Sequence, residues 1–201
     1  MTLRLLSAFV ALAFCSAQAE DHRLESLLLL PEPKIMRNSL SFFPEGAELT
    51  VLTPAKELKE TPWVMPYRPD EFKQLGLSVE TFAERAKKAA DKRLATLKPE
   101  LIKNAEGQVA YAVYRSDQPL MASLLVAPSL PAIFEKLFGD EIWVALPDRH
   151  SLFVFPARPE AIEEFAADLE QRYLSDTRAA SPEIFAIKKG GVPKVVASFL
   201  E

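Results

Sequence analysis

The stretch GDEIWVALPDRHSLFVF, residues 139–155, decides the fold of this chain. It contains two apolar runs, 141–146 and 151–155, on either side of residues that favour a turn. Both runs are apolar at odd and at even positions, as strands are when both faces of their sheet are buried. The stretch therefore predicts a β-hairpin in the middle of a sheet, with Trp143 packed between that sheet and a helix.

The sequence after this hairpin predicts a helix and a second hairpin. Pro159 stands where helices often begin, and apolar residues then recur at helical spacing as far as Tyr173. Two further runs, 183–188 and 192–199, lie on either side of a Lys-Gly-Gly turn. Because Pro193 has no amide hydrogen to donate, the second of these strands is expected at an edge of the sheet.

The sequence before the central hairpin predicts two helices and a pair of strands. Ser78 is suited to cap a long amphipathic helix over 79–97. A short helix is expected over 129–138, and the runs 109–115 and 120–127 are expected to pair as a hairpin. The whole order predicts an α+β fold, an antiparallel or mixed sheet of about six strands with three helices packed on it.

Residues 20–70 are expected to form a proline-rich, loop-rich segment in front of the α+β domain, which would span 71–201. Seven prolines disfavour long helices and central strands here: Pro31, Pro33, Pro44, Pro54, Pro62, Pro66 and Pro69. The one clear strand candidate is 48–53, and 23–30 reads as a short helix or an extended apolar arm. Residues 63–67, Trp-Val-Met-Pro-Tyr, either pack over the edge of the core or form an exposed site for a partner.

The N-terminus has the features of a secretory signal peptide, residues 1–19. Arg4 precedes an apolar run over 5–14, and small side chains, including Ala19, precede Glu20. A helix that crosses a membrane needs about 20 apolar residues, so this run is too short to serve as an anchor. Cleavage between Ala19 and Glu20 and export to the periplasm or beyond are therefore expected, with no transmembrane anchor in the mature chain.

Cysteine and charge exclude several classes of function. Cys15 is the only cysteine, and it follows the bulky Phe14, which disfavours lipoprotein processing at that position. Cleavage after the signal peptide removes it, which excludes thiol catalysis, disulfides and cysteine-based metal sites. The chain has 24 basic and 28 acidic residues, a net charge of -4, and no block of like charges, so nucleic acid is not expected as a partner. Two histidines and six glycines form no metal-binding or nucleotide-binding pattern, and no cofactor is expected.

One cluster of polar residues stands out, Asp148, Arg149 and His150, in the turn of the central hairpin. Together they display a carboxylate, a guanidinium and an imidazole at one end of the sheet. Two interpretations stay open. The cluster is either a structural turn in which Arg149 is exposed, or a site that binds a carboxylate or phosphate through Arg149.

A helix leads into Met-Ala-Ser-Leu-Leu, residues 121–125, and then into the Gly-Asp, strand, Pro-x-Arg, strand arrangement of residues 139–152. This order resembles the uncharacterised bacterial family called domain of unknown function family 1444, over roughly Leu77 to Phe155. The resemblance implies an α+β fold, and it implies no known activity and no catalytic residues.

The expected function is therefore that of an exported, non-catalytic binding protein of the cell envelope. Its partner would be an unknown protein or a small anionic ligand, bound through the proline-rich segment or the end of the sheet. The alternative is a small hydrolase-like enzyme that uses His150 and Asp148. A deep pocket around these side chains would favour the enzyme, and an exposed turn would favour the binding protein.

Overall fold

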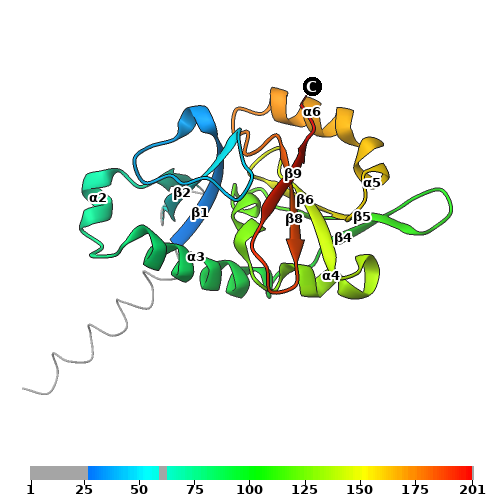
Figure 1. Ribbon diagram of the computed structural model, residues 1–201, viewed down its shortest axis with the longest axis horizontal. Coiled ribbons are helices and arrows are strands. Elements are labelled where there is room, and N and C mark those ends of the chain that lie inside the picture. The colour runs from blue at the N-terminus through cyan, green and yellow to red at the C-terminus, as the bar shows by residue number, and fades with distance from the viewer. Residues whose placement is uncertain (1–26, 59–62, 201) are drawn as a thin grey trace, which may run out of the picture.

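The hairpin predicted over residues 141–155 lies at the centre of a six-stranded sheet (Figure 1). The computed structural model describes residues 27–58 and 63–200. The strands of this sheet are β4 (Glu100–Lys103), β5 (Val109–Arg115), β6 (Glu141–Ala145), β7 (Ser151–Pro156), β8 (Glu183–Lys188) and β9 (Lys194–Ser198). Their order is β4-β5-β7-β6-β8-β9, and every neighbouring pair is antiparallel. The predicted α+β class is confirmed, and β9 is an edge strand as Pro193 indicates.

Helices cover both faces of this sheet, which is why its central strands are apolar on both sides. Leu152 and Val154 of β7 belong to one buried cluster, together with α3 (Val79–Leu94) and α4 (Leu130–Phe138). Phe153 and Phe155 belong to another, together with α5 (Glu160–Glu163) and α6 (Ala166–Ser175). In Figure 1 the first pair of helices lies at the bottom and the second pair at the top.

The helices begin and end for local reasons that the sequence carries. The Ser78 hydroxyl accepts a hydrogen bond from the amide of Thr81 at 3.2 Å and so caps α3, as predicted. Gly139 ends α4 with a φ of 91°, a conformation that favours glycine. The prediction of a single helix as far as Tyr173 is wrong, because the chain forms two helices there. The break between α5 and α6 lies at Phe165, whose ring packs edge-on against that of Tyr111.

The run 120–127 is not a strand, which corrects the hairpin predicted there. It forms a buried 3-10 helix, η2 (Met121–Val126), and the hairpin partner of β5 is β4 instead. Both edges of β5 are occupied, one by β4 and the other by β7, so no further strand has room to pair with it. The amides of Met121 and Ala122 donate to the carbonyl of Arg149, which fixes η2 against the central turn.

A second sheet of three strands precedes the first. Its elements, with two short helices, are β1 (Leu27–Pro33), η1 (Lys34–Met36), β2 (Thr50–Glu57), β3 (Val64–Pro66) and α2 (Pro69–Lys73). The strand expected over 48–53 is confirmed as β2, which lies between β1 and β3 and is antiparallel to both. The expectation that prolines keep central strands out of this region is wrong, since Pro54 lies within β2.

Pro54 fits in a central strand because its missing amide hydrogen faces a position beyond the end of β3. The amide and carbonyl of one residue point to the same side of an antiparallel strand. The Pro54 carbonyl accepts from the amide of Tyr67 at 2.9 Å, so the absent donor also faces Tyr67. The carbonyl of Tyr67 accepts a hydrogen bond from the Asn38 side chain at 3.3 Å. The ladder thus loses no partner at this point.

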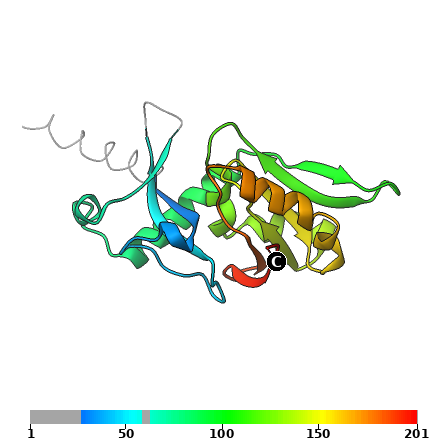
Figure 2. The same ribbon diagram turned by 90° about the horizontal axis from the view of Figure 1, so that it is seen from above.

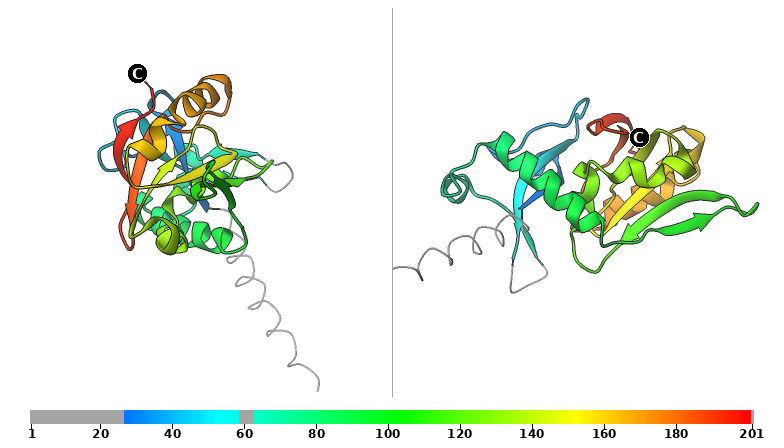
Figure 3. Two further views of the ribbon diagram at one scale, coloured as in Figure 1. Left: turned by 90° about the vertical axis from the view of Figure 1, so that its right-hand side faces the viewer. Right: turned by 90° about the horizontal axis from the view of Figure 1, so that it is seen from below.

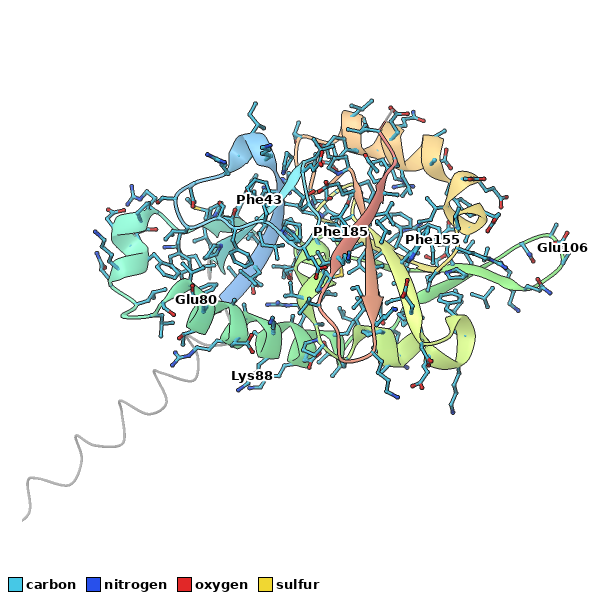
Figure 4. All side chains as sticks on the ribbon, viewed as in Figure 1. Phe43, Glu80, Lys88, Glu106, Phe155 and Phe185 are labelled. Carbon is cyan, nitrogen blue, oxygen red and sulfur yellow. The ribbon has the colours of Figure 1, made fainter. Side chains whose placement is uncertain are left out.

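The two sheets lie side by side and share one core (Figure 2). Helix α3 packs against β1 and runs below both sheets (Figure 3). One apolar cluster contains Leu30 of β1 and also Phe185 of β8, which is labelled in Figure 4. A carboxylate oxygen of the buried Glu183 accepts hydrogen bonds from the amides of Glu48 and Leu49, at 2.8 and 3.0 Å.

Trp143 is only half-buried, which corrects its assignment to the core. It lies in β6 opposite Phe155 of β7, on the face that α5 and α6 cover. Its ring packs at the margin of that cluster, and its indole N–H donates to a carboxylate oxygen of Glu141 at 3.4 Å. A strand that is apolar on both sides indicates that both faces are covered, but it does not indicate how far the covering helices extend.

Candidate functional site

The turn that holds Asp148, Arg149 and His150 connects β6 to β7 at one end of the six-stranded sheet. It is packed against the segment before β8. The carbonyl of Pro147 accepts from the amide of Ala180, and the amide of Arg149 donates to the carbonyl of Arg178, both at 3.2 Å. The turn is therefore part of the folded body and does not project into solvent.

The Asp148 carboxylate holds the turn together. One oxygen accepts from the amide of His150 and the other from the hydroxyl of Ser151, both at 2.7 Å. Asp side chains commonly bond to backbone groups two residues ahead in this way. The carboxylate is buried, and each of its oxygens already faces a donor within the turn.

Arg149 is not exposed, which corrects the sequence-based interpretation. Its guanidinium donates to a carboxylate oxygen of Glu32 in β1 at 2.8 Å. The Glu32 side chain is 1% exposed and that of Arg149 is 14% exposed. The two residues are 117 positions apart in the chain, so no local pattern indicates their contact. Arg149 thus joins the two sheets through Glu32.

Burial shifts the pKa values of both groups in this ion pair. It raises the pKa of the Glu32 carboxyl, and smaller effects of Thr53 and Arg149 oppose the rise. It also lowers the pKa of the Arg149 guanidinium, an effect that Glu32 opposes. An arginine in a protein stays protonated at neutral pH all the same. The second oxygen of Glu32 and the Nε of Arg149 have no hydrogen-bond partner among the described residues.

His150 contacts a neighbour with each ring nitrogen. Nδ1 lies 3.1 Å from the carbonyl oxygen of Ser116, and Nε2 lies 3.3 Å from a guanidinium nitrogen of Arg178. Arginine only donates and a carbonyl only accepts, so we assign the proton to Nδ1 and the acceptor role to Nε2. Arg178 also lies over the ring of Trp63, 4.2 Å from its centroid. The nitrogen that a general base would use is therefore already occupied.

A hollow of about 520 Å³ opens beside the turn. Its walls carry both signs of charge, with arginines and carboxylates side by side: Arg115, Ser116, Asp117, Asp148, His150, Ser151, Arg172 and Asp176. No serine hydroxyl is hydrogen-bonded to the His150 ring within the described residues, since Ser151 donates to Asp148. In the part of the chain that the structure covers, no group of His, Cys, Asp and Glu is placed to hold a metal ion.

A cluster of exposed apolar side chains lies on the connection between β1 and β2, at a place that the sequence did not single out. Its members are Ile35 (91% exposed), Met36 (58%), Phe43 (42%) and Leu49 (42%), which we call the apolar tip. The amide of Lys34 donates to the carbonyl of Leu49 at 2.7 Å, and the Lys34 ammonium lies 5.7 Å from the centroid of the Phe43 ring. Lys34 thus brings the parts of the tip together.

A signal for the apolar tip exists in the sequence. Ile35 and Met36 stand next to each other between Lys34 and Arg37, in a region with no helical or strand periodicity to bury them.

The segment 63–67 was expected either to pack over the edge of the core or to form an exposed site. Val64 and Tyr67 are buried, while Trp63 and Met65 are exposed, so the segment packs over the core through only some of its residues.

Comparison with known proteins finds no matching family model, no matching curated protein and no matching solved structure. The resemblance to domain of unknown function family 1444 stays a prediction. Among the described residues, no helix is long and apolar enough to span a membrane. Cys15 and the predicted cleavage between Ala19 and Glu20 lie outside the described residues.

Proposed function

We propose that this chain is an exported protein of the cell envelope that binds a partner and carries out no catalysis. The apolar tip is the observation that carries the proposal. Contiguous exposed apolar side chains mark surfaces of interaction, whereas single exposed ones do not. The signal-peptide features before Glu20 support export of the mature chain.

The central turn favours binding over a hydrolase-like activity. Hydrolysis through a nucleophile needs a hydroxyl within reach of a free base. Here Nε2 of His150 faces Arg178, and the hydroxyl of Ser151 faces Asp148. Because these polar atoms are engaged in contacts that hold the turn, they support a structural role for it.

The proposal is tested with the mature chain, which begins at Glu20, and with a variant that carries Ile35→Ser and Met36→Ser. Leu174→Ser is the matched control, because Leu174 is also exposed but lies on α6, away from the tip. Each protein is sedimented with an envelope fraction of the source cells. We expect the parent and the control to sediment with the envelope and the tip variant to stay in the supernatant.

The same proteins are incubated with chromogenic esters and phosphates, together with a His150→Ala variant. No turnover above the buffer rate is expected. Turnover that His150→Ala abolishes and the tip variant retains would favour the hydrolase-like alternative. A tip variant that sediments as fully as the parent would refute the assignment of binding to the apolar tip.

A further inference from the structure

We infer that the partner of the apolar tip is the surface of a membrane that contains anionic lipid. This inference rests on the proposed binding function and gives that function a chemical target. It follows from three features of the tip, which are the exposure of its apolar side chains, the rigidity of the backbone that carries them, and the cations on either side.

The apolar side chains stand at the outer end of the N-terminal sheet. Helix η1 follows β1 in the blue part of Figure 1, and Phe43 is labelled below it in Figure 4. None of the three residues of η1 is buried. Ile35, at 91%, is the most exposed of the large apolar side chains that the structure describes. A projecting group of this kind can enter a lipid interface without any opening of the fold.

The backbone below the tip is held in place before any partner arrives. The amide of Lys34 bonds to Leu49, and the amide of Arg37 donates to the carbonyl of Lys34 at 3.2 Å. The side chain of Asn38 then accepts from the amide of Leu40 at 2.8 Å and closes the following turn. A surface that is already ordered loses little conformational entropy when it binds.

Two cations lie beside the apolar residues. Lys34 and Arg37 are exposed, and neither forms an ion pair within the described ranges 27–58 and 63–200. They stand out against a chain whose net charge is -4. Lys and Arg near a membrane surface are attracted to anionic headgroups, while neighbouring apolar side chains enter the acyl boundary.

Two acidic residues of the same loop affect the attraction between the tip and an anionic surface. Glu45 forms an ion pair with Lys194 at 3.0 Å, so its charge is partly compensated. Glu48 precedes Leu49 and is exposed. Its charge opposes attraction to an anionic surface, so Glu48→Gln is expected to strengthen binding.

The inference is tested by co-sedimentation of the mature chain with two kinds of vesicle, phosphatidylcholine alone and phosphatidylcholine mixed with phosphatidylglycerol. We expect binding to the mixed vesicles that weakens as salt is added. The double variant Ile35→Ser and Met36→Ser should bind at least about ten-fold more weakly than the parent, since it loses the apolar groups that enter the bilayer. Leu174→Ser should bind as the parent does.

The variant Lys34→Gln with Arg37→Gln separates charge from apolar contact. It should lose the preference for phosphatidylglycerol and most of the salt dependence. Circular dichroism of each variant establishes that it is folded, and the exposed positions make this the expected result.

The outcomes separate failure of the lipid target from failure of the proposed function. If the parent binds the envelope fraction but not vesicles made from lipids extracted from it, the partner is a protein and only the lipid target is wrong. If the parent binds neither, both proposals are wrong. Equal binding to both kinds of vesicle by the parent would remove the role assigned to Lys34 and Arg37.

Discussion

Arg149 joins the two sheets through a single buried carboxylate, and its removal is expected to destabilise the fold. Arg149→Ala leaves Glu32 buried without a charged partner, and breaking a buried pair in this way costs about 3 to 5 kcal/mol of unfolding free energy. Urea unfolding at neutral pH measures the loss. The exposed position expected from the turn pattern would predict a change below about 0.5 kcal/mol, and a result of that size would contradict the ion pair.

Glu32 should also make stability depend on pH. Because burial raises its pKa, the folded chain holds this proton more tightly than the unfolded chain does. The contribution of Glu32 to stability is therefore full below its ordinary pKa, about 4.3, and is lost as the pH rises through the raised value. Relative to a Glu32→Gln variant, the parent should lose unfolding free energy as the pH rises from about 4 through the raised pKa of Glu32. A constant difference between the two proteins over this range would contradict the raised pKa.

Trp143 and Phe155 face each other across the central hairpin but differ in burial. Phe155 is fully buried, so Phe155→Ala is expected to cost about 3 to 5 kcal/mol. Trp143→Ala should cost less, about 2 kcal/mol, because the half-buried ring leaves a smaller cavity. Denaturant unfolding of both variants decides the order. A larger loss for Trp143 would place that ring in the core after all.

At the scale of the element, the cap of α3 tests how far local chemistry fixes a helix. Ser78→Ala removes the acceptor for the Thr81 amide and should lower the unfolding free energy by about 1 kcal/mol. Ser78→Asp keeps an acceptor at the same place and should retain most of the stability. Thermal melts compare the three proteins. Equal melting temperatures for parent and Ser78→Ala would show that packing against β1 alone holds this end.

The elements that formed as predicted are those whose signals are local. The central hairpin, the start of α3 and the glycine end of α4 depend on neighbouring residues, so short patterns are enough. The run 120–127 shows the opposite case. It is apolar except for Ser123, and such a run fits a buried strand or a buried helix equally well. The occupied edges of β5 decide between them.

At the scale of the whole molecule, stability should rest on packing and polar contacts alone. Cys15, the only cysteine, precedes the predicted cleavage at Ala19, and the described residues hold no cluster suited to a metal ion. The mature chain is therefore expected to melt at the same temperature with and without a reductant or EDTA. Calorimetry on the protein purified without chelator makes the comparison. A fall of several degrees in EDTA would instead show that a bound metal ion stabilises the protein.

The sequence by itself determined the α+β class, the central position of the hairpin over 141–155 and the edge position of the strand after Pro193. It also placed Asp148 in the turn of that hairpin. Each of these follows from periodicity or from the chemistry of a few adjacent residues.

Only the tertiary structure decided the pairing of Arg149 with Glu32, the half-burial of Trp143 and the exposure of Ile35. The contact between Glu32 and Arg149 joins residues 117 positions apart, and side-chain exposure depends on what other elements cover. Such long-range contacts form because burial of the shared apolar core brings the two sheets together. No short stretch of sequence contains that information.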